Sequence, residues 1–155
     1  MSFSSLLKSE RINLSLRSKK KESVIKELVG LIKVGKDAEV IISTLIKREQ
    51  LGSTGIGRGV AIPHCRSLLV DRLEIAVGRS QGGIDFDSID KKPVHLLFLI
   101  IAPPQDPGNQ YLLTLGRIVQ LSKEMVKKKI FMEPKTPKDF IKLVARIEKV
   151  IDRGR

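Results

Sequence analysis

The spacing of apolar residues predicts two helices in the first third of the chain. A first helix is expected to begin after Ser18, which can cap it, and to end near Gly35. Its apolar residues recur at steps of three and four, which places them on one face: Val24, Ile25, Leu28, Leu31 and Ile32. A second helix is expected from Asp37 to about Gln50, because the same spacing continues there.

The middle of the chain has the pattern of strands. Residues 60–62 form a short strand candidate that ends at Pro63, and residues 73–79 alternate apolar and polar side chains. Residues 81–87 are expected to be turns, since glycine and aspartate are frequent there. Residues 94–101 are apolar on both faces, which is typical of a central strand covered on both sides.

Two further helices are predicted in the last third. One runs from about residue 109 to 127, and the other begins at Pro137, after Thr136 as its cap, and continues through Val150. The predicted order is helix, helix, three strands, helix, helix. We therefore expect one α/β domain over residues 1–155, with a mixed central sheet and helices packed on both faces as a three-layer sandwich.

Composition agrees with a soluble globular protein. The chain has 155 residues, 41% of them hydrophobic, and a mean hydropathy of -0.04. Cys65 is the only cysteine, so no internal disulfide forms. The first residues lack the pattern of a secretory signal, and no apolar run is long enough for a membrane span. We expect a cytoplasmic location.

The charge of +12 admits several partners. It can attract nucleic acid, an anionic membrane or acidic proteins, or it can be a solvated basic surface. Aromatic residues make up only 4% of the chain and none is interleaved with the basic clusters, so single-strand binding is disfavoured. No element that reads duplex DNA is evident either. Nucleic acid is therefore disfavoured as a partner, and the sequence leaves the oligomeric state open.

A glycine-rich segment at residues 52–59 holds the first candidate site. Its backbone N–H groups, with the hydroxyls of Ser53 and Thr54, can hydrogen-bond an anion such as phosphate. It lacks the Gly-Lys-Ser/Thr of a P-loop, and it follows a helix rather than a strand, so a nucleotide site is disfavoured. Most glycine-rich loops bind nothing, and that alternative remains.

His64 is the candidate nucleophile. It follows Pro63, which stiffens the backbone, and a neutral imidazole with a free ring nitrogen can attack phosphorus. Arg48 and Arg58 are near in sequence and can neutralise phosphoryl oxygens. No cluster of metal ligands accompanies them. From these residues alone, an inert histidine is the commoner alternative.

The segment from Arg48 to His64, REQLGSTGIGRGVAIPH, resembles the active-site signature of the phosphotransferase-system (PTS) IIA proteins of the fructose/mannitol type, EIIA type 2. The similarity extends to residues 4–12, 84–90 and 93–99, and the chain is most similar to the nitrogen-regulatory IIA proteins. It implies an α/β domain in which His64 accepts a phosphoryl group from the small carrier HPr. Arg48, Ser53, Thr54 and Gly55 would support that group. No metal, nucleotide or other cofactor is implied.

The resemblance leaves the physiological role open. The match to the nitrogen-regulatory subgroup favours a regulatory phosphocarrier that controls protein targets through its phosphorylation state. One alternative is a sugar-specific IIA component that passes the group to a IIB domain. Another is a binding module that is no longer phosphorylated. Whether the chain counts as an enzyme is uncertain, because it would be a transferase component with a phosphohistidine intermediate.

The sequence also departs from that family. Many members carry a second histidine near the phosphorylated one, and the sequence places Gln110 at that position. Gln110 is expected to support the phosphoryl group by donating a hydrogen bond to one of its oxygens, although it cannot titrate. His95 is interpreted as a strand residue without chemistry. Cys65 is interpreted as a packed, unreactive thiol, although its neighbours Arg66 and His64 leave a reactive thiol as the alternative.

Overall fold

The computed structural model describes residues 2–127 and 129–154. Six strands form one sheet in the order β1-β5-β6-β3-β2, with β4 also paired to β6. The strands are β1 (Ile12–Asn13), β2 (Gly55–Gly57), β3 (Val60–Ala61), β4 (His64–Arg66), β5 (Glu74–Ile84) and β6 (Val94–Ala102). The helices are α1 (Lys21–Val29), α2 (Gly35–Gln50), α3 (Gln110–Lys127) and α4 (Pro137–Arg153), with short 3-10 turns η1 (Ser4–Leu6), η2 (Ser9–Arg11) and η3 (Ile130–Met132).

The sheet is mixed, as predicted. β5 and β6 pair antiparallel at its centre, while β1 runs parallel to β5 and both β3 and β4 run parallel to β6. β6 is the apolar strand expected at residues 94–101, and its side chains are buried except at His95. A strand buried on both faces needs a layer on each side, which the helices supply.

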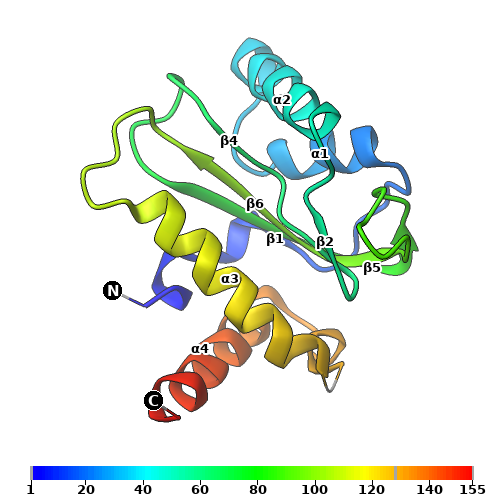
Figure 1. The fold of residues 1–155 in the computed structure, drawn as a ribbon, viewed down its shortest axis with the longest axis vertical. Helices are drawn as coiled ribbons and strands as arrows, with labels where there is room; N and C mark the ends of the chain where they lie inside the picture. Colours follow the sequence, from blue (N-terminus) through cyan, green and yellow to red (C-terminus); the bar gives the residue numbers. More distant parts are fainter. Residues whose placement is uncertain (1, 128, 155) are drawn as a thin grey trace.

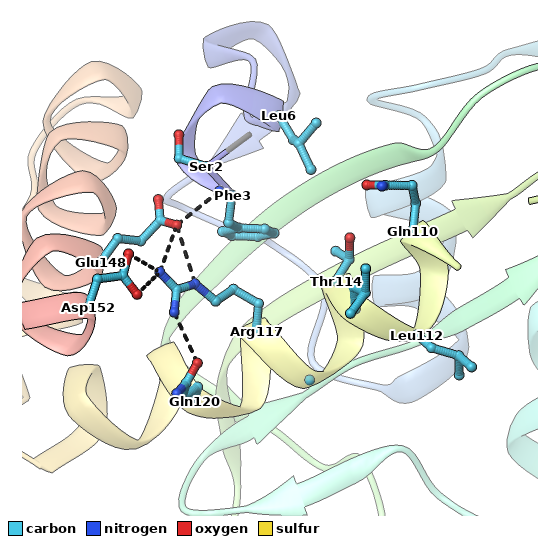
Figure 2. A pocket seen from close by; sticks show the side chains of 12 residues that line it. Ser2, Phe3, Leu6, Gln110, Leu112, Thr114, Arg117, Gln120, Glu148 and Asp152 are labelled. Atoms are coloured by element: carbon cyan, nitrogen blue, oxygen red, sulfur yellow. Dashed lines mark hydrogen bonds and ion pairs between the residues drawn. The ribbon is translucent and has the colours of Figure 1, made fainter. Parts of the chain in front are cut away.

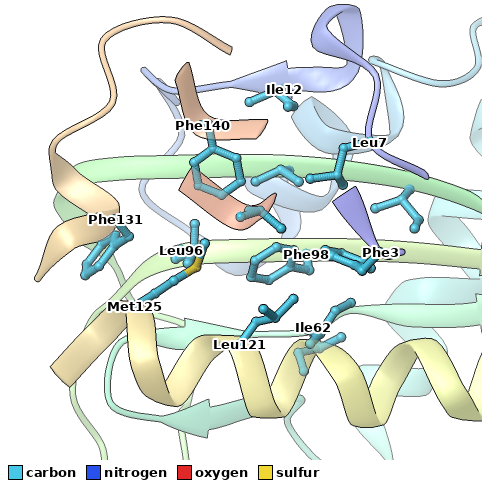
Figure 3. Packing of buried hydrophobic residues seen from close by; sticks show 14 of the residues in the cluster. Phe3, Leu7, Ile12, Ile62, Leu96, Phe98, Leu121, Met125, Phe131 and Phe140 are labelled. Carbon is cyan, nitrogen blue, oxygen red and sulfur yellow. The ribbon is translucent and has the colours of Figure 1, made fainter. Parts of the chain in front are cut away.

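Helices α1 and α2 cover one face of the sheet, and α3 and α4 cover the other (Figure 1). The two faces alternate along β6, because successive strand residues point to opposite sides. Leu96, Phe98 and Ile100 belong to the cluster under α3 and α4. Leu97, Leu99 and Ile101 belong to the cluster under α1 and α2. Figure 3 shows the first cluster, with Phe98 lying between Phe3 and Phe140.

The last helix begins as the sequence predicts. Thr136 is its N-cap, with its side-chain oxygen accepting from the amide of Asp139 at 3.1 Å, and Pro137 opens the first turn. Within residues 2–127 and 129–154, none of the helices is long and apolar enough to cross a membrane. The expected three-layer α/β architecture is confirmed.

The structure corrects several boundaries. α1 begins at Lys21 rather than after Ser18, because the Ser18 amide donates to Glu27 Oε1 at 3.0 Å and its side chain caps nothing. Gly35 opens α2 with φ +70 instead of ending α1, which stops at Val29. β5 continues through the expected turn to Ile84, with an irregular register after Arg79.

Candidate functional site

His64 lies where two short strands meet beside β6. β3 and β4 pair with the same strand, and Pro63 separates them while its carbonyl accepts the amide of Ile100 at 3.0 Å. Strand alternation decides the direction of the side chain, because Ile62 belongs to the cluster under α3 and α4, and Cys65 to the opposite cluster. His64 therefore faces α3, half-buried at the end of the sheet.

One nitrogen of the His64 ring is held by the backbone. Nδ1 lies 2.7 Å from the carbonyl oxygen of Ile62. A carbonyl oxygen only accepts, so Nδ1 carries the proton and donates. In the neutral ring the lone pair is then on Nε2, which is the nitrogen available for attack on phosphorus.

Tyr111, in the first turn of α3, packs against this ring. The two ring centroids are 5.9 Å apart at an interplanar angle of 64°, an edge-on contact. The guanidinium of Arg66 lies over the Tyr111 ring, 4.8 Å from its centroid, and donates to the Pro103 carbonyl at 3.0 Å. Asp106 fixes the turn by accepting the Tyr111 amide at 2.8 Å. The ring contact between His64 and Tyr111 joins β4 to α3 at the site.

Arg48, near the end of α2, supplies a second positive charge. Its Nη1 donates to the carbonyl of Gly52 at 2.9 Å, which fixes the guanidinium at the start of the glycine-rich segment. Burial raises the pKa of Tyr111, and the Cys65 charge adds to this, while the charges of Arg66 and Arg48 oppose it. The charges of both guanidiniums thus act on Tyr111, the residue whose ring contacts His64.

The segment that precedes His64 is fixed by a buried carboxylate. Glu49 is only 6% exposed, and it accepts the Thr54 amide at 3.0 Å and the Thr54 hydroxyl. The Thr54 carbonyl accepts the Ile62 amide at 3.0 Å, and the Ile62 carbonyl in turn accepts from His64. Lys21 lies 3.5 Å from Glu49 and balances its charge. An ion pair from Lys21 to Glu49, followed by hydrogen bonds through Thr54 and Ile62, thus connects Lys21 to the imidazole.

Ser53 and Gly55 are engaged within the chain as well. The Ser53 hydroxyl donates to the Phe86 carbonyl at 2.7 Å and accepts the Gly55 amide at 3.0 Å. A Cβ on Gly55 would lie 2.9 Å from the Cα of Ser88, closer than side chains pack. Glycine is therefore required there by the backbone of Ser88. These groups stabilise the loop, and their direct contact with a phosphoryl group stays a prediction.

Cys65 and His95 fit the less reactive interpretations. Cys65 is buried under α1 and α2, and burial raises the pKa of its thiol to about 11. Its thiolate is accordingly scarce at neutral pH. His95 has Nδ1 2.9 Å from the Ser80 carbonyl and lies five residues before Ile100, the partner of His64, so it is about 16 Å along the strand.

Gln110 has a different setting from its neighbour Tyr111. Its side chain is exposed and lines a hollow of about 950 Å³ between η1, α3 and α4. Figure 2 shows this hollow, with Gln110 at one end and the Arg117–Glu148–Asp152 ion pairs at the other. Glu148 also accepts the amides of Phe3 and Ser4, which attaches the start of the chain to α4.

A family model agrees with this site. Residues 5–147 match the family described as "Phosphoenolpyruvate-dependent sugar phosphotransferase system, EIIA 2". The chain belongs to this family. The match includes the whole glycine-rich segment and His64, so the site lies inside the family's own domain.

Curated relatives of the family come from two groups. The fructose-specific EIIABC component of Bacillus subtilis is 39% identical over 134 residues, 84% of this chain, but the chain spans only 21% of that longer protein. The nitrogen regulatory protein of Bradyrhizobium diazoefficiens is 32% identical over 80% of this chain and 82% of its own length. The nitrogen regulatory protein of Escherichia coli is 35% identical over 77% of this chain and 75% of its own length.

Solved structures of the family have the same fold. The nitrogen regulatory protein IIA-Ntr from Neisseria meningitidis superposes with a TM-score of 0.82 at 26% identity, over 91% of this chain and 97% of that one. The mannitol IIA of Escherichia coli superposes with a TM-score of 0.71 at 16% identity, over 89% of this chain and 98% of that one.

The structure shows where the other residues predicted from the sequence lie relative to His64. The charge of Arg48 acts on Tyr111, the residue that contacts His64, and its role at the phosphoryl group stays a prediction. Arg58 lies elsewhere. Arg58 lies beside Lys123, about 18 Å along α3 from Tyr111, because the β2–β3 turn points towards the end of that helix. Its expected role at the site is therefore wrong. The expected role of Gln110 at the phosphoryl group stays a prediction, although its neighbour Tyr111 makes the contact with His64.

Sequence reasoning missed Tyr111, Arg66 and Glu49. Arg66 could have been predicted from strand periodicity, because residues 64 and 66 of one strand share a face. Glu49 lies within the signature segment, but the pattern alone does not say that its carboxylate is buried. Within residues 2–127 and 129–154, no cluster of three or more histidine, cysteine or carboxylate side chains is arranged to hold a metal.

Proposed function

We propose that this protein is a phosphocarrier of the phosphoenolpyruvate-dependent phosphotransferase system, in which Nε2 of His64 accepts a phosphoryl group. The observation that carries the proposal is the hydrogen bond from His64 Nδ1 to the Ile62 carbonyl, 2.7 Å long, in a chain of the EIIA 2 family. It fixes the tautomer whose lone pair is on Nε2. The ring is a nucleophile without needing a separate base.

The transfer balances without any additional reactant. The Nε2 lone pair forms the new P–N bond while the P–N bond of a donor phosphohistidine breaks. The His64 ring keeps its Nδ1 proton and becomes a phosphoimidazolium, whose positive charge the Ile62 carbonyl stabilises. The donor ring keeps the proton on the nitrogen that did not carry the phosphoryl group, and it leaves as neutral imidazole. Arg48 compensates charge on the phosphoryl oxygens, which is most of what phosphoryl transfer requires.

An HPr-type carrier is the proposed donor, and a regulatory role is favoured downstream. Support for that role comes from the TM-score of 0.82 with the Neisseria IIA-Ntr and from nitrogen regulatory relatives that match over most of their length. Regulatory proteins are then the proposed targets, recognised according to the phosphorylation state of His64. The cytoplasm, where such carriers meet, is the proposed location.

A sugar-transport role is the second candidate. It is supported by 39% identity to the fructose-specific EIIABC component. It is also supported by the fold shared with the mannitol IIA protein whose complex with phosphorylated IIB has been solved. In that case a IIB domain receives the phosphoryl group from His64. Phosphoryl release to a purified fructose-type IIB domain, measured by the mass of both proteins, separates the two roles.

The test of the proposal is direct phosphorylation. The protein is incubated with phosphoenolpyruvate, enzyme I and HPr, and intact mass spectrometry follows the addition of one acid-labile phosphoryl group. We expect the label on the native protein and its loss in His64→Ala. His95→Ala is the matched control, since these are the chain's 2 histidines, and it should keep the label. An unlabelled, folded native protein would instead favour a binding module that no longer turns over phosphate.

A further inference from the structure

Tyr111 combines a contact with His64 and an unused hydroxyl. It is 8% exposed, and its ring lies edge-on to the imidazole. Within residues 2–127 and 129–154 its hydroxyl forms no hydrogen bond, and it is not among the fully buried polar atoms. A buried tyrosine ordinarily pairs its hydroxyl within the protein. The Tyr111 hydroxyl instead keeps some contact with solvent, and the ring that carries it contacts His64.

The charges around this hydroxyl favour an anion. Arg66 of β4 lies over the ring, and Arg48 of α2 is within electrostatic range. The other titratable neighbours are His64 and Cys65 of β4, and Asp106, whose carboxylate is occupied by the first amides of α3. Two positive charges and an O–H donor without a hydrogen-bond partner in the described residues are therefore grouped around the Tyr111 ring, which contacts His64. Positive charges and hydrogen-bond donors are what phosphoryl oxygens require.

We propose that Tyr111 is a phosphoryl-positioning residue, whose hydroxyl donates a hydrogen bond to an oxygen of the phosphoryl group on His64 while Arg66 fixes its ring. This rests on the proposed function and adds a residue to it. The role resembles that expected of the second histidine in family members that have one. In this chain it is assigned to the position after Gln110.

A tyrosine donor differs from a histidine in its dependence on pH. Burial raises the pKa of Tyr111, so its hydroxyl stays protonated and able to donate throughout the neutral range. A histidine with an ordinary pKa of about 6.5 would change charge there. Tyr111→His should therefore add an ionisation to the pH–rate profile of phosphorylation, between about pH 5 and 8, that the native protein lacks.

The test uses potassium phosphoramidate, a small donor that needs no carrier protein. Its P–N bond breaks as the bond to Nε2 forms, and ammonia leaves. We expect Tyr111→Phe to keep the aromatic ring and the fold. The rate at which His64 is phosphorylated, or the rate at which its phosphoryl group is hydrolysed, should change about tenfold, which is the usual effect of one hydrogen bond to a charged group. Leu113→Ala is the control, because that side chain is exposed on the same helical turn.

The native protein provides a second readout that needs no Tyr111 variant. The chain has one tyrosine and no tryptophan, so its intrinsic emission comes from Tyr111 alone. Phosphorylation should change this emission in the native protein, and phosphoramidate should leave that of His64→Ala unchanged. A phosphorylated native protein with unchanged emission, or Tyr111→Phe with native rates, overturns the positioning role but leaves the phosphocarrier function standing. Failure to phosphorylate the native protein at all contradicts both.

Discussion

Glu49 and Thr54 are joined by two hydrogen bonds, in which one buried carboxylate accepts both the amide and the hydroxyl of the same residue. The pair connects the end of α2 to the segment that precedes His64. Because the Thr54 carbonyl also accepts the Ile62 amide, the position of the Ile62 carbonyl depends on this pair. The orientation of the imidazole is therefore decided partly by a carboxylate that lies away from it in the chain.

Glu49→Gln should weaken both the fold and the site. Glutamine offers one accepting oxygen in place of two, and Lys21 loses its buried partner at 3.5 Å. We expect the free energy of unfolding to fall by about 2 kcal/mol and phosphorylation of His64 to slow several-fold. Urea unfolding and the phosphoramidate rate measure the two effects. Glu39→Gln, exposed on the same helix, is the control, and equal losses in both variants would falsify the role assigned to Glu49.

Two glycines should respond oppositely to the same substitution. Gly55→Ala places a methyl group 2.9 Å from the Ser88 Cα, so a backbone must shift. We expect a loss of about 2 kcal/mol and a slower phosphorylation. Gly116→Ala, in α3 with nothing within 4 Å of the added carbon, should stabilise the protein by about 0.5–1 kcal/mol. Thermal unfolding of the two variants tests this, and a stable Gly55→Ala would contradict the packing argument.

Long, strongly periodic segments were predictable from the sequence, and short ones were not. The central strand near residues 94–102 and the helices that begin at Gln110 and Pro137 were expected, because each buries a continuous apolar face. β1, β2 and β4 have two or three residues each, and their formation depends on pairing with distant strands. Gly35 was misassigned because glycine can end one helix or, at φ +70, begin another.

The site was predictable only as far as one signature segment extends. His64 and Arg48 lie within it, and their roles in phosphoryl transfer stay predictions. Tyr111 approaches from α3, after the whole sheet has been built, so no local pattern relates it to His64. Arg58 was assigned to the site from its closeness in sequence, but the β2–β3 turn carries it to the far end of α3.

Cys65 should make the fold less stable at alkaline pH. Burial raises the pKa of its thiol from an ordinary value of 9.0 to about 11, so the native state holds the proton more tightly. Stability from this group is fully present below pH 9.0 and is lost as the pH rises towards about 11. Between pH 9.0 and about 11 the free energy of unfolding should fall by about 2 kcal/mol less in Cys65→Ala than in the native protein.

Thiol labelling checks the same residue independently. At pH 7 the native protein should react with iodoacetamide far more slowly than the protein unfolded in urea, because the thiol is buried and protonated. Rapid labelling of the folded protein would mean that Cys65 is a reactive thiol, which is the alternative that its neighbours Arg66 and His64 left open.

The charge of +12 should appear in the salt dependence of transfer from the carrier. If the donor HPr carries a basic docking surface, encounter between the two positive proteins is slowed at low salt and speeds up as salt screens the repulsion. We expect the transfer rate from a basic HPr to rise between about 0.05 and 0.3 M salt. Phosphoramidate, a small anion, should show the opposite trend. A carrier rate that falls with salt would mean that the docking surface around His64 attracts basic partners despite the overall charge.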